Sequence, residues 1–243
     1  MQNRYVGDIG DYSKFVLIKN LFNGKCGIIW YLYPNEGHNN DGKFRNYEKF
    51  ELQDKEIVEI MSYFSKHKES ERSVQELEKI LINNGFDLTF FSNCIECNCK
   101  CLFSNVNERL EYRKSWFDKA LNKMKNCNIV FADPDNGIEV KSCPLGDVKS
   151  GKYIYFDEIS KLLKNHKTVV IYQHFERSKT HRVLVDEKVK KLYEKIGNNF
   201  NFYAVKFKKV SPRAYFILSK ENLENKIREF CDEFKNEFEL LKG

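Results

Sequence analysis

Apolar residues recur along the chain in two patterns, short continuous runs and longer stripes at helical spacing. Continuous runs rich in β-branched residues predict buried strands, because a strand covered on both faces has no polar side. Stripes with an apolar residue every third or fourth position predict amphipathic helices. The predicted strands are 27–33, 88–91, 128–132, 168–172, 202–207 and 214–218, and the predicted helices are 12–22, 54–66, 73–83, 107–125, 158–165, 179–196 and 221–241.

The order of these elements predicts an α/β fold. Strands alternate with helices, which favours a mostly parallel sheet flanked by helices. The last two strands, 202–207 and 214–218, are separated by a short connection, so they must pair as a C-terminal antiparallel hairpin. No internal repeat, linker or low-complexity tract divides the chain, and we expect a single domain over residues 1–243.

Charge and composition narrow the class of protein. Lys and Arg number 41 against 35 Asp and Glu, giving a net charge of +6, which permits a nucleic-acid partner without demanding one. No stretch approaches the roughly 18 apolar residues of a membrane span, and no secretion signal precedes the first helix. We therefore expect a cytoplasmic protein with no membrane partner, whose eight cysteines are reduced thiols or metal ligands.

Four of the cysteines lie close together at Cys94, Cys97, Cys99 and Cys101. Structural zinc sites usually join two C-x-x-C or C-x-x-H pairs across a longer loop, and here the second pair is missing. The spacing therefore favours a cysteine-rich loop or strand pair over a zinc or iron-sulfur site.

The strongest candidate for chemistry is the turn Asp133-Pro134-Asp135-Asn136, directly after the predicted strand 128–132. Open parallel sheets bind ligands at the carboxyl ends of their strands. Carboxylate and carbonyl oxygens fixed in a turn can accept hydrogen bonds from an amine and orient its lone pair. We predict Asp133, Asp135 and Asn136 as catalytic residues; the alternative is a simple Asx-Pro turn, because all these residues are turn formers.

Two further segments lie near the same predicted edge. His174 follows the strand 168–172 and is a candidate base, although a lone histidine is often structural. The polar loop 34–42 contains Asn35, Glu36 and Asp41, whose oxygens can accept hydrogen bonds from ribose hydroxyls or an amine of a cofactor. The alternative for that segment is a long surface loop.

The layout of these elements resembles the class I S-adenosylmethionine-dependent methyltransferases, whose fourth strand delivers a D/N-P-P-Y/F motif. The segment 7–15 is similar to the G-N-x-A-D-x-x-K-H segment of the ribosomal-RNA large-subunit adenine-N6 methyltransferases, with Gly7, Asp11 and Lys14 coinciding. The resemblance implies a Rossmann-like sheet, S-adenosylmethionine as cofactor and a nucleic-acid substrate methylated on an adenine amine. It also implies that Asp11 and Lys14 border the cofactor and the target base.

The chain departs from that family in two places. The loop after the first strand is not glycine-rich, and Asp135 and Asn136 stand where the family has proline and an aromatic ring. That ring would stack on a flipped base, and Tyr153 or Tyr155 is the candidate to replace it.

Two other functions compete with methyl transfer. Asp135, Glu139 and Lys141 superficially match the PD-(D/E)-x-K pattern of metal-dependent nucleases, but such nucleases carry the two acids on successive strands, farther apart in sequence. The other alternative is a non-catalytic nucleic-acid-binding module of the same fold, favoured by the missing glycine-rich loop.

Overall fold

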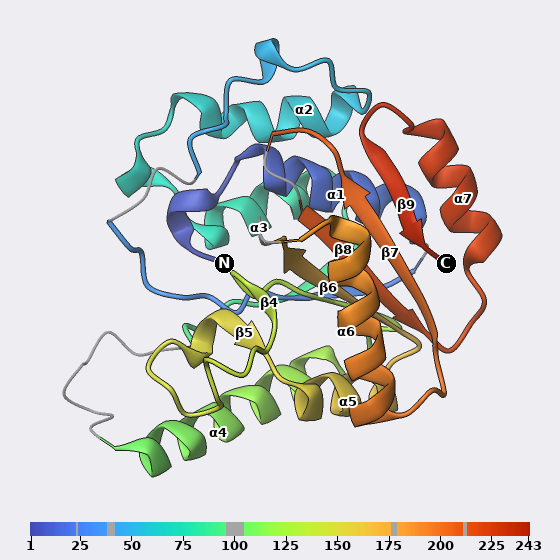
Figure 1. The fold of residues 1–243 in the computed structure, drawn as a ribbon. Helices are drawn as coiled ribbons and strands as arrows, with labels where there is room; N and C mark the ends of the chain where they lie inside the picture. Colours follow the sequence, from blue (N-terminus) through green and yellow to red (C-terminus); the bar gives the residue numbers. More distant parts are fainter. Residues whose placement is uncertain (23, 38–41, 96–104, 176–178, 211–212) are drawn as a thin grey trace.

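A seven-stranded sheet crosses the fold, with helices on both faces (Figure 1). This computed structural model describes residues 1–22, 24–37, 42–95, 105–175, 179–210 and 213–243. The strand order is β2-β1-β3-β6-β8-β7-β9. The strands are β1 (Cys26–Ile29), β2 (Leu88–Phe91), β3 (Ile129–Ala132), β6 (Thr168–His174), β7 (Asn201–Phe207), β8 (Arg213–Ser219) and β9 (Phe238–Lys242).

One half of the sheet is parallel. β1 pairs with β2 on one side and with β3 on the other, and β3 pairs with β6, all in parallel register. β1 and β3 are buried along their whole length. Helices cover both faces of the sheet here, so both faces of these strands are apolar.

The other half is antiparallel, and the predicted C-terminal hairpin is present. β8 pairs with both β6 and β7, and β9 adds a third antiparallel pair at the edge. The sheet is therefore mixed, and the prediction of a mostly parallel sheet was wrong. The physical reason is that β8 returns directly from β7 and lies between β6 and β7, so it runs antiparallel to both, and β9 then pairs antiparallel with the outer edge of β7.

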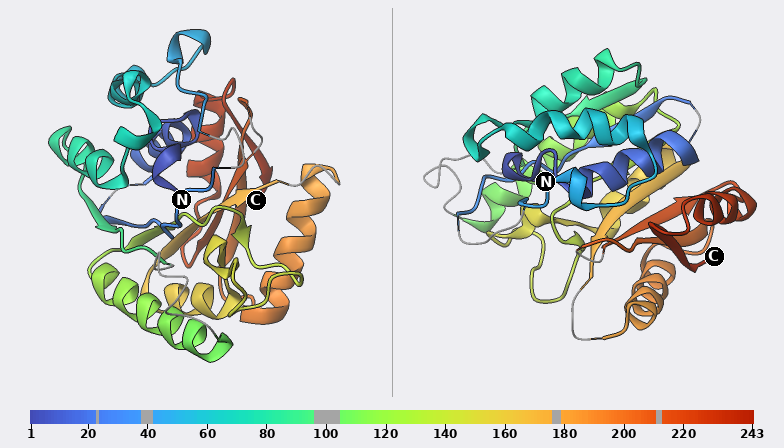
Figure 2. Two further views of the ribbon diagram at one scale, coloured as in Figure 1. Left: turned by 90° about the vertical axis from the view of Figure 1, so that its left-hand side faces the viewer. Right: turned by 90° about the horizontal axis from the view of Figure 1, so that it is seen from above.

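The helices divide between the two faces (Figure 2). Apolar side chains of α1, α2, α3 and α7 form one core against the sheet, and those of α4, α5 and α6 form the other. The helices are α1 (Ile9–Leu21), α2 (Lys55–Ser62), α3 (Val74–Asn83), α4 (Val106–Met124), α5 (Phe156–Asn165), α6 (His181–Ile196) and α7 (Glu224–Glu233), with short 3-10 turns at Asn3–Tyr5, Tyr47–Lys49, Tyr63–Lys66, Glu69–Glu71 and Ser150–Lys152.

The C-terminal helix predicted over 221–241 was wrong in its second half. α7 ends at Glu233, and the chain returns as strand β9. Buried Glu237 fixes the change, since its side chain accepts hydrogen bonds from Tyr12 Oη at 2.8 Å and from the Gln53 nitrogen at 2.5 Å. Both partners lie far away in sequence, so no local pattern indicates the strand.

A second, two-stranded parallel sheet joins β4 (Gly137–Ile138) to β5 (Tyr153–Ile154) beside the end of β6. β5 leads into α5, which begins at Phe156, two residues before the predicted helix start at 158. The N-cap is Tyr155, whose nitrogen donates to Glu158 Oε2 at 3.2 Å. Strands of two residues carry no periodicity, so this small sheet is absent from the sequence prediction.

None of the helices in the described ranges has the length and apolar character needed to cross a bilayer.

Candidate functional site

Several chain segments converge at the carboxyl end of the parallel strands. β3 runs into Asp133 and Pro134, and β6 ends at His174. β8 runs antiparallel to β6, so its first residue, Arg213, pairs with His174 and begins at this same edge. The first turns of α1 complete the cluster, which brings Lys14 beside Asp133.

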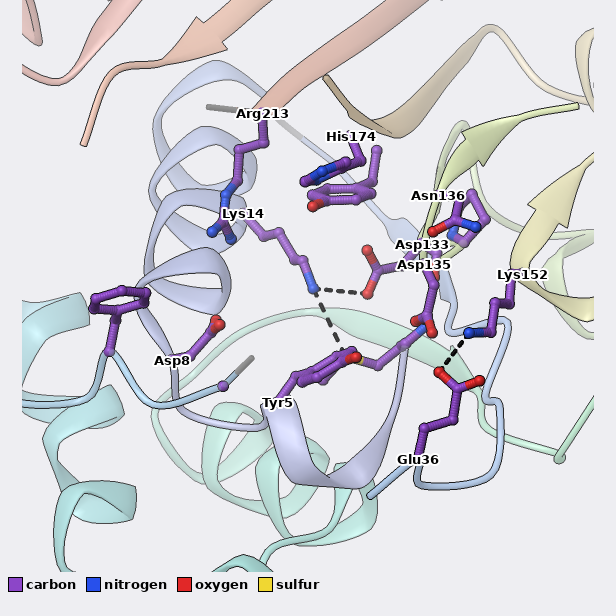
Figure 3. A pocket seen from close by; sticks show the side chains of 15 residues that line it. Tyr5, Asp8, Lys14, Glu36, Asp133, Asp135, Asn136, Lys152, His174 and Arg213 are labelled. Carbon is purple, nitrogen blue, oxygen red and sulfur yellow. Dashed lines mark hydrogen bonds and ion pairs between the residues drawn. The ribbon is translucent and has the colours of Figure 1, made fainter. Parts of the chain in front are cut away.

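These segments surround a cavity of about 200 Å³ (Figure 3). Its lining combines carboxylates, cations and aromatic rings. The lining residues are Met1, Tyr5, Asp8, Lys14, Glu36, Gly42, Phe44, Asp133, Pro134, Asp135, Asn136, Lys152, Tyr172, His174 and Arg213.

Lys14 is the buried cation at the centre of the site. Its ammonium lies 2.7 Å from Asp133 Oδ2 and 2.9 Å from Asp11 Oδ1, and all three residues are at most 5% exposed. The ammonium also lies 5.6 Å from the ring centroid of Trp30 and 5.8 Å from that of Tyr172. Charge attraction and aromatic faces together hold the Lys14 side chain in one position.

Within this cluster one ammonium, that of Lys14, contacts two carboxylates, and the Met1 ammonium adds a further positive charge near Asp133. Burial raises the pKa of Asp133 and of Asp11, although the Lys14 charge opposes the rise. Burial disfavours the charged form of Lys14, but Asp11 and Asp133 outweigh it and raise the pKa of Lys14. The lysine therefore stays charged, while a carboxyl group beside it takes up a proton more readily than an exposed aspartate.

Asp133 presents its second oxygen to the cavity. Lys14 engages Oδ2, and no described residue donates a hydrogen bond to Oδ1. Figure 3 shows this second oxygen on the side that faces His174. One Asp133 oxygen is thus fixed by the protein and the other is free to accept from a ligand.

A polar network closes the neighbouring wall. Asp135 Oδ1 forms an ion pair with the Met1 ammonium at 2.5 Å. Asp135 Oδ2 accepts a hydrogen bond from the Gln2 side-chain amide at 2.7 Å. Gln2 also donates to Glu36 at 3.2 Å, and Glu36 forms an ion pair with Lys152 (Figure 3). The network joins four segments that are far apart in sequence, so the sequence alone does not indicate it.

The N-terminus of α1 is occupied by the protein's own carboxylates. Asp8 caps the helix by accepting from the nitrogens of Gly10 at 2.7 Å and Asp11 at 3.2 Å. Asp11 in turn accepts from the Gly7 nitrogen at 2.9 Å. Because these donors are used, this helix end is not a phosphate site of the kind common in nucleotide-binding folds.

The aromatic rings of the cavity are not the ones predicted. Tyr155 is buried and donates its hydroxyl to the Cys143 carbonyl at 3.0 Å, and neither it nor Tyr153 lines the cavity. The rings that do so belong to Tyr5, Phe44 and Tyr172. Phe44 lines the cavity and is 37% exposed, so part of its ring is open to solvent at the rim.

The other predicted cofactor contacts fall in three places. Asp11 lies behind Lys14 and does not line the cavity. Asn35 accepts a hydrogen bond from the Arg4 nitrogen at 3.2 Å beside the cavity wall. Glu36 lines the cavity, whereas Asp41 lies outside the described residues.

The residues of the predicted nuclease motif are not gathered in the cavity. Asp135 lines it, but Glu139 accepts from the Phe156 nitrogen at 2.7 Å at the start of α5, and Lys141 is not among the lining residues. The nuclease hypothesis thus gains no support from the arrangement of these three residues.

Most of the four clustered cysteines, for which zinc was the less favoured interpretation, lie outside the described residues. Cys94 is half-buried, whereas Cys97, Cys99 and Cys101 lie outside the described residues. Among the residues that are described, no three His, Cys, Asp or Glu side chains are grouped so that they could hold a metal ion.

Several lining residues were not predicted as site residues, among them Phe44, Lys152, Tyr172 and Arg213. Tyr172 had a signal, since it lies two positions before His174 on the same strand and therefore on the same face. Lys152 belongs to an irregular segment and had none. Two other basic residues of the C-terminal hairpin have partners elsewhere: Lys206 pairs with Glu239 at 3.5 Å, and Lys208 contacts the Lys235 carbonyl.

The chain matches no family model, and no curated protein or solved structure shows detectable similarity to it.

Proposed function

We propose that this protein is an S-adenosylmethionine-dependent methyltransferase that acts on an amine of a nucleic-acid base, with the adenine amine as its target. The observation that carries the proposal is Asp133 at the carboxyl end of β3. Lys14 holds one of its oxygens at 2.7 Å, and the other faces a cavity with aromatic rings. As part of this proposal we class the sheet as Rossmann-like, supported by its parallel half β2-β1-β3-β6.

The cavity suits a flat ring that carries an amine. Asp133 Oδ1 and the turn that ends at Asn136 offer acceptors to an exocyclic amine, and Tyr172 and Tyr5 offer aromatic surface. At about 200 Å³ the cavity is smaller than the roughly 300–1,000 Å³ of common ligand pockets. It therefore admits a single base, which must be unpaired or flipped out of its stack.

The lining also offers partners for the amino-acid end and the ribose of S-adenosylmethionine. Carboxylates of Asp8 and Glu36 suit its ammonium and ribose hydroxyls, and Lys152 suits its carboxylate. When bound, this cofactor supplies an electrophilic methyl group. Cofactor and base together need more room than the cavity gives, so the proposal requires the Lys152–Glu36 ion pair to open on binding.

The chain's own residues would then act by position and charge. Asp133 accepts a hydrogen bond from the amine and turns its lone pair toward the methyl donor. Because burial raises the pKa of Asp133, its carboxylate is also a better acceptor for the proton that the amine releases. Lys14 keeps the carboxylate in place without entering the reaction.

The partner and the compartment follow from the same proposal. Arg213 in the cavity lining and the net charge of +6 favour a polyanionic substrate. A cytoplasmic site of action agrees with the reduced thiols of Cys26, Cys127 and Cys231.

Isothermal titration of the purified chain with S-adenosylmethionine tests the proposal. We expect saturable binding, weakened at least tenfold in Glu36→Gln and unchanged in Asp118→Asn, an exposed control on α4. The absence of binding at millimolar cofactor would contradict the proposed function.

A further inference from the structure

Gln173 connects the end of β6 to the Asp133 turn. Its amide nitrogen donates to the Asn136 carbonyl at 3.1 Å and to its own neighbour's carbonyl, that of His174, at 2.8 Å. Its amide oxygen accepts from the Ile138 nitrogen at 3.0 Å. The residue is only 6% exposed and does not line the cavity.

The turn is shaped around this side chain. Gly137 has φ +98°, a conformation that side chains rarely adopt. A Cβ atom at Gly137 would lie 2.4 Å from the Gln173 amide oxygen, so glycine gives the amide the space it occupies. Backbone and side chain therefore meet here in direct contact.

Only an amide satisfies all three backbone groups. Glutamate in place of Gln173 keeps an acceptor for the Ile138 nitrogen but loses both donors, and an apolar side chain leaves a buried nitrogen and two carbonyls without this partner. The chemistry of the side chain thus matches the backbone groups that border the catalytic turn.

We propose that Gln173 is a positioning residue that fixes the turn Asp133–Asn136 against the end of β6. By holding the carbonyl of Asn136 and that of His174 at once, it sets the distance between the acceptors of the turn and the strand end that carries His174. Its effect on the reaction rests on the proposed function, whereas its hold on the backbone does not.

The test compares Gln173→Met and Gln173→Glu with Gln53→Met, a control glutamine whose amide bonds the Glu233 carbonyl at 3.1 Å away from the cavity. Hydrogen exchange of the Ile138 amide reports the contact itself. We expect exchange roughly tenfold faster in Gln173→Met, near the wild-type rate in Gln173→Glu, and unchanged in Gln53→Met. An unchanged rate in Gln173→Met would overturn the inference.

Methyl-transfer kinetics, measured below the unfolding transition of every variant, report the consequence for catalysis. We expect kcat to fall roughly 10- to 100-fold in both Gln173 variants with KM for the cofactor unchanged, because misplaced acceptors cost rate rather than cofactor binding. Wild-type kcat in these variants would overturn the positioning role. If the wild-type chain transfers no methyl group, the proposed function fails, and the Ile138 exchange still decides whether Gln173 holds the turn.

Discussion

Two buried clusters of charge lie on opposite faces of the sheet. They differ in the number of carboxylates that the cation contacts and in whether they border the cavity. On the face covered by α4 and α5, Arg113 meets Glu158 through two contacts of 2.7 and 2.8 Å, and its guanidinium also donates to the Tyr153 carbonyl. On the α1 face, Lys14 meets two carboxylates, and one of these borders the cavity.

The difference separates a structural ion pair from a candidate site. The positive charge of Arg113 and the negative charge of Glu158 neutralise each other. The aromatic rings of Tyr31, Trp116 and Tyr155 lie within 5.5 Å of the guanidinium. Neither residue lines the main cavity. In the Lys14 cluster an acidic oxygen, Asp133 Oδ1, has no partner among the described residues and faces the cavity of about 200 Å³. Shifted pKa values occur in both clusters. Contact with the cavity and an acidic oxygen without a partner are therefore the better guides to function.

Breaking the balanced pair has the largest expected effect. Arg113→Ala leaves Glu158 buried without its cation, and we expect a loss of about 3–5 kcal/mol in the free energy of unfolding, measured by denaturant titration. The double variant Arg113→Met/Glu158→Leu removes both charges and should regain most of that loss. If Arg113→Ala alone unfolds at the wild-type denaturant concentration, the pair does not stabilise the fold.

Removing the cation of the Lys14 cluster should reduce the free energy of unfolding by a smaller amount, and this loss should depend on pH. In Lys14→Met the pKa of Asp11 and of Asp133, already raised by burial, rises further, because the ammonium that opposed the rise is gone. A carboxyl group whose pKa is raised in the folded state favours folding when protonated, and this contribution is lost as pH rises through the folded-state pKa. We expect a loss of about 2–4 kcal/mol at pH 8 that shrinks at pH 5.

Denaturant titration of Lys14→Met and the wild type at both pH values checks this prediction. A loss that stays constant or grows toward pH 5 would show that the two carboxyl groups do not take up the proton.

The exposed ring at the cavity rim should matter for binding alone. We expect Phe44→Ala to weaken binding of a single-stranded oligonucleotide by about 1–3 kcal/mol, the value of one stacked base. Ile82→Ala, which removes a 53% exposed side chain on α3, should leave affinity unchanged. Fluorescence anisotropy at fixed salt measures both, and equal affinities of wild type and Phe44→Ala would remove Phe44 from the interface.

A buried histidine outside both clusters gives the smallest effect. His166 is 2% exposed and its ring contacts the Cys127 carbonyl at 2.8 Å, and burial lowers the pKa of His166. A histidine with a lowered pKa stabilises the fold above its unfolded pKa of about 6.5 and loses that contribution as pH falls. One proton limits the slope to about 1.4 kcal/mol per pH unit.

His166→Gln should therefore flatten the decline in stability between pH 7 and 5. Thermal unfolding across this range provides the measurement, and parallel curves for variant and wild type would contradict the assignment.

Much of the fold was predictable because periodicity reports burial. β2 agrees in both bounds with the predicted strand 88–91, and β3 lies inside the predicted 128–132. β9 was not predictable, since Glu237 and its partners Tyr12 and Gln53 are brought together only by the fold.

The candidate site was also predictable only in part. Asp133 and His174 end strands whose apolar runs are visible in the sequence, so their common edge could be inferred. Arg213 reaches that edge only because β8 inserts beside β6, and Lys152 arrives through an irregular segment. Phe44 follows a polar loop, and no pattern marks its exposed ring as part of the cavity.

The most direct test of the central claim is transfer of a labelled methyl group from S-adenosylmethionine to single-stranded RNA and DNA, with the product nucleoside identified by mass spectrometry. The account predicts N6-methyladenine from the wild-type chain, a loss of roughly 10²- to 10³-fold in kcat for Asp133→Asn, and wild-type rates for Asp118→Asn. Equal rates for Asp133→Asn and the wild type, or oligonucleotide binding without any transfer, would contradict it.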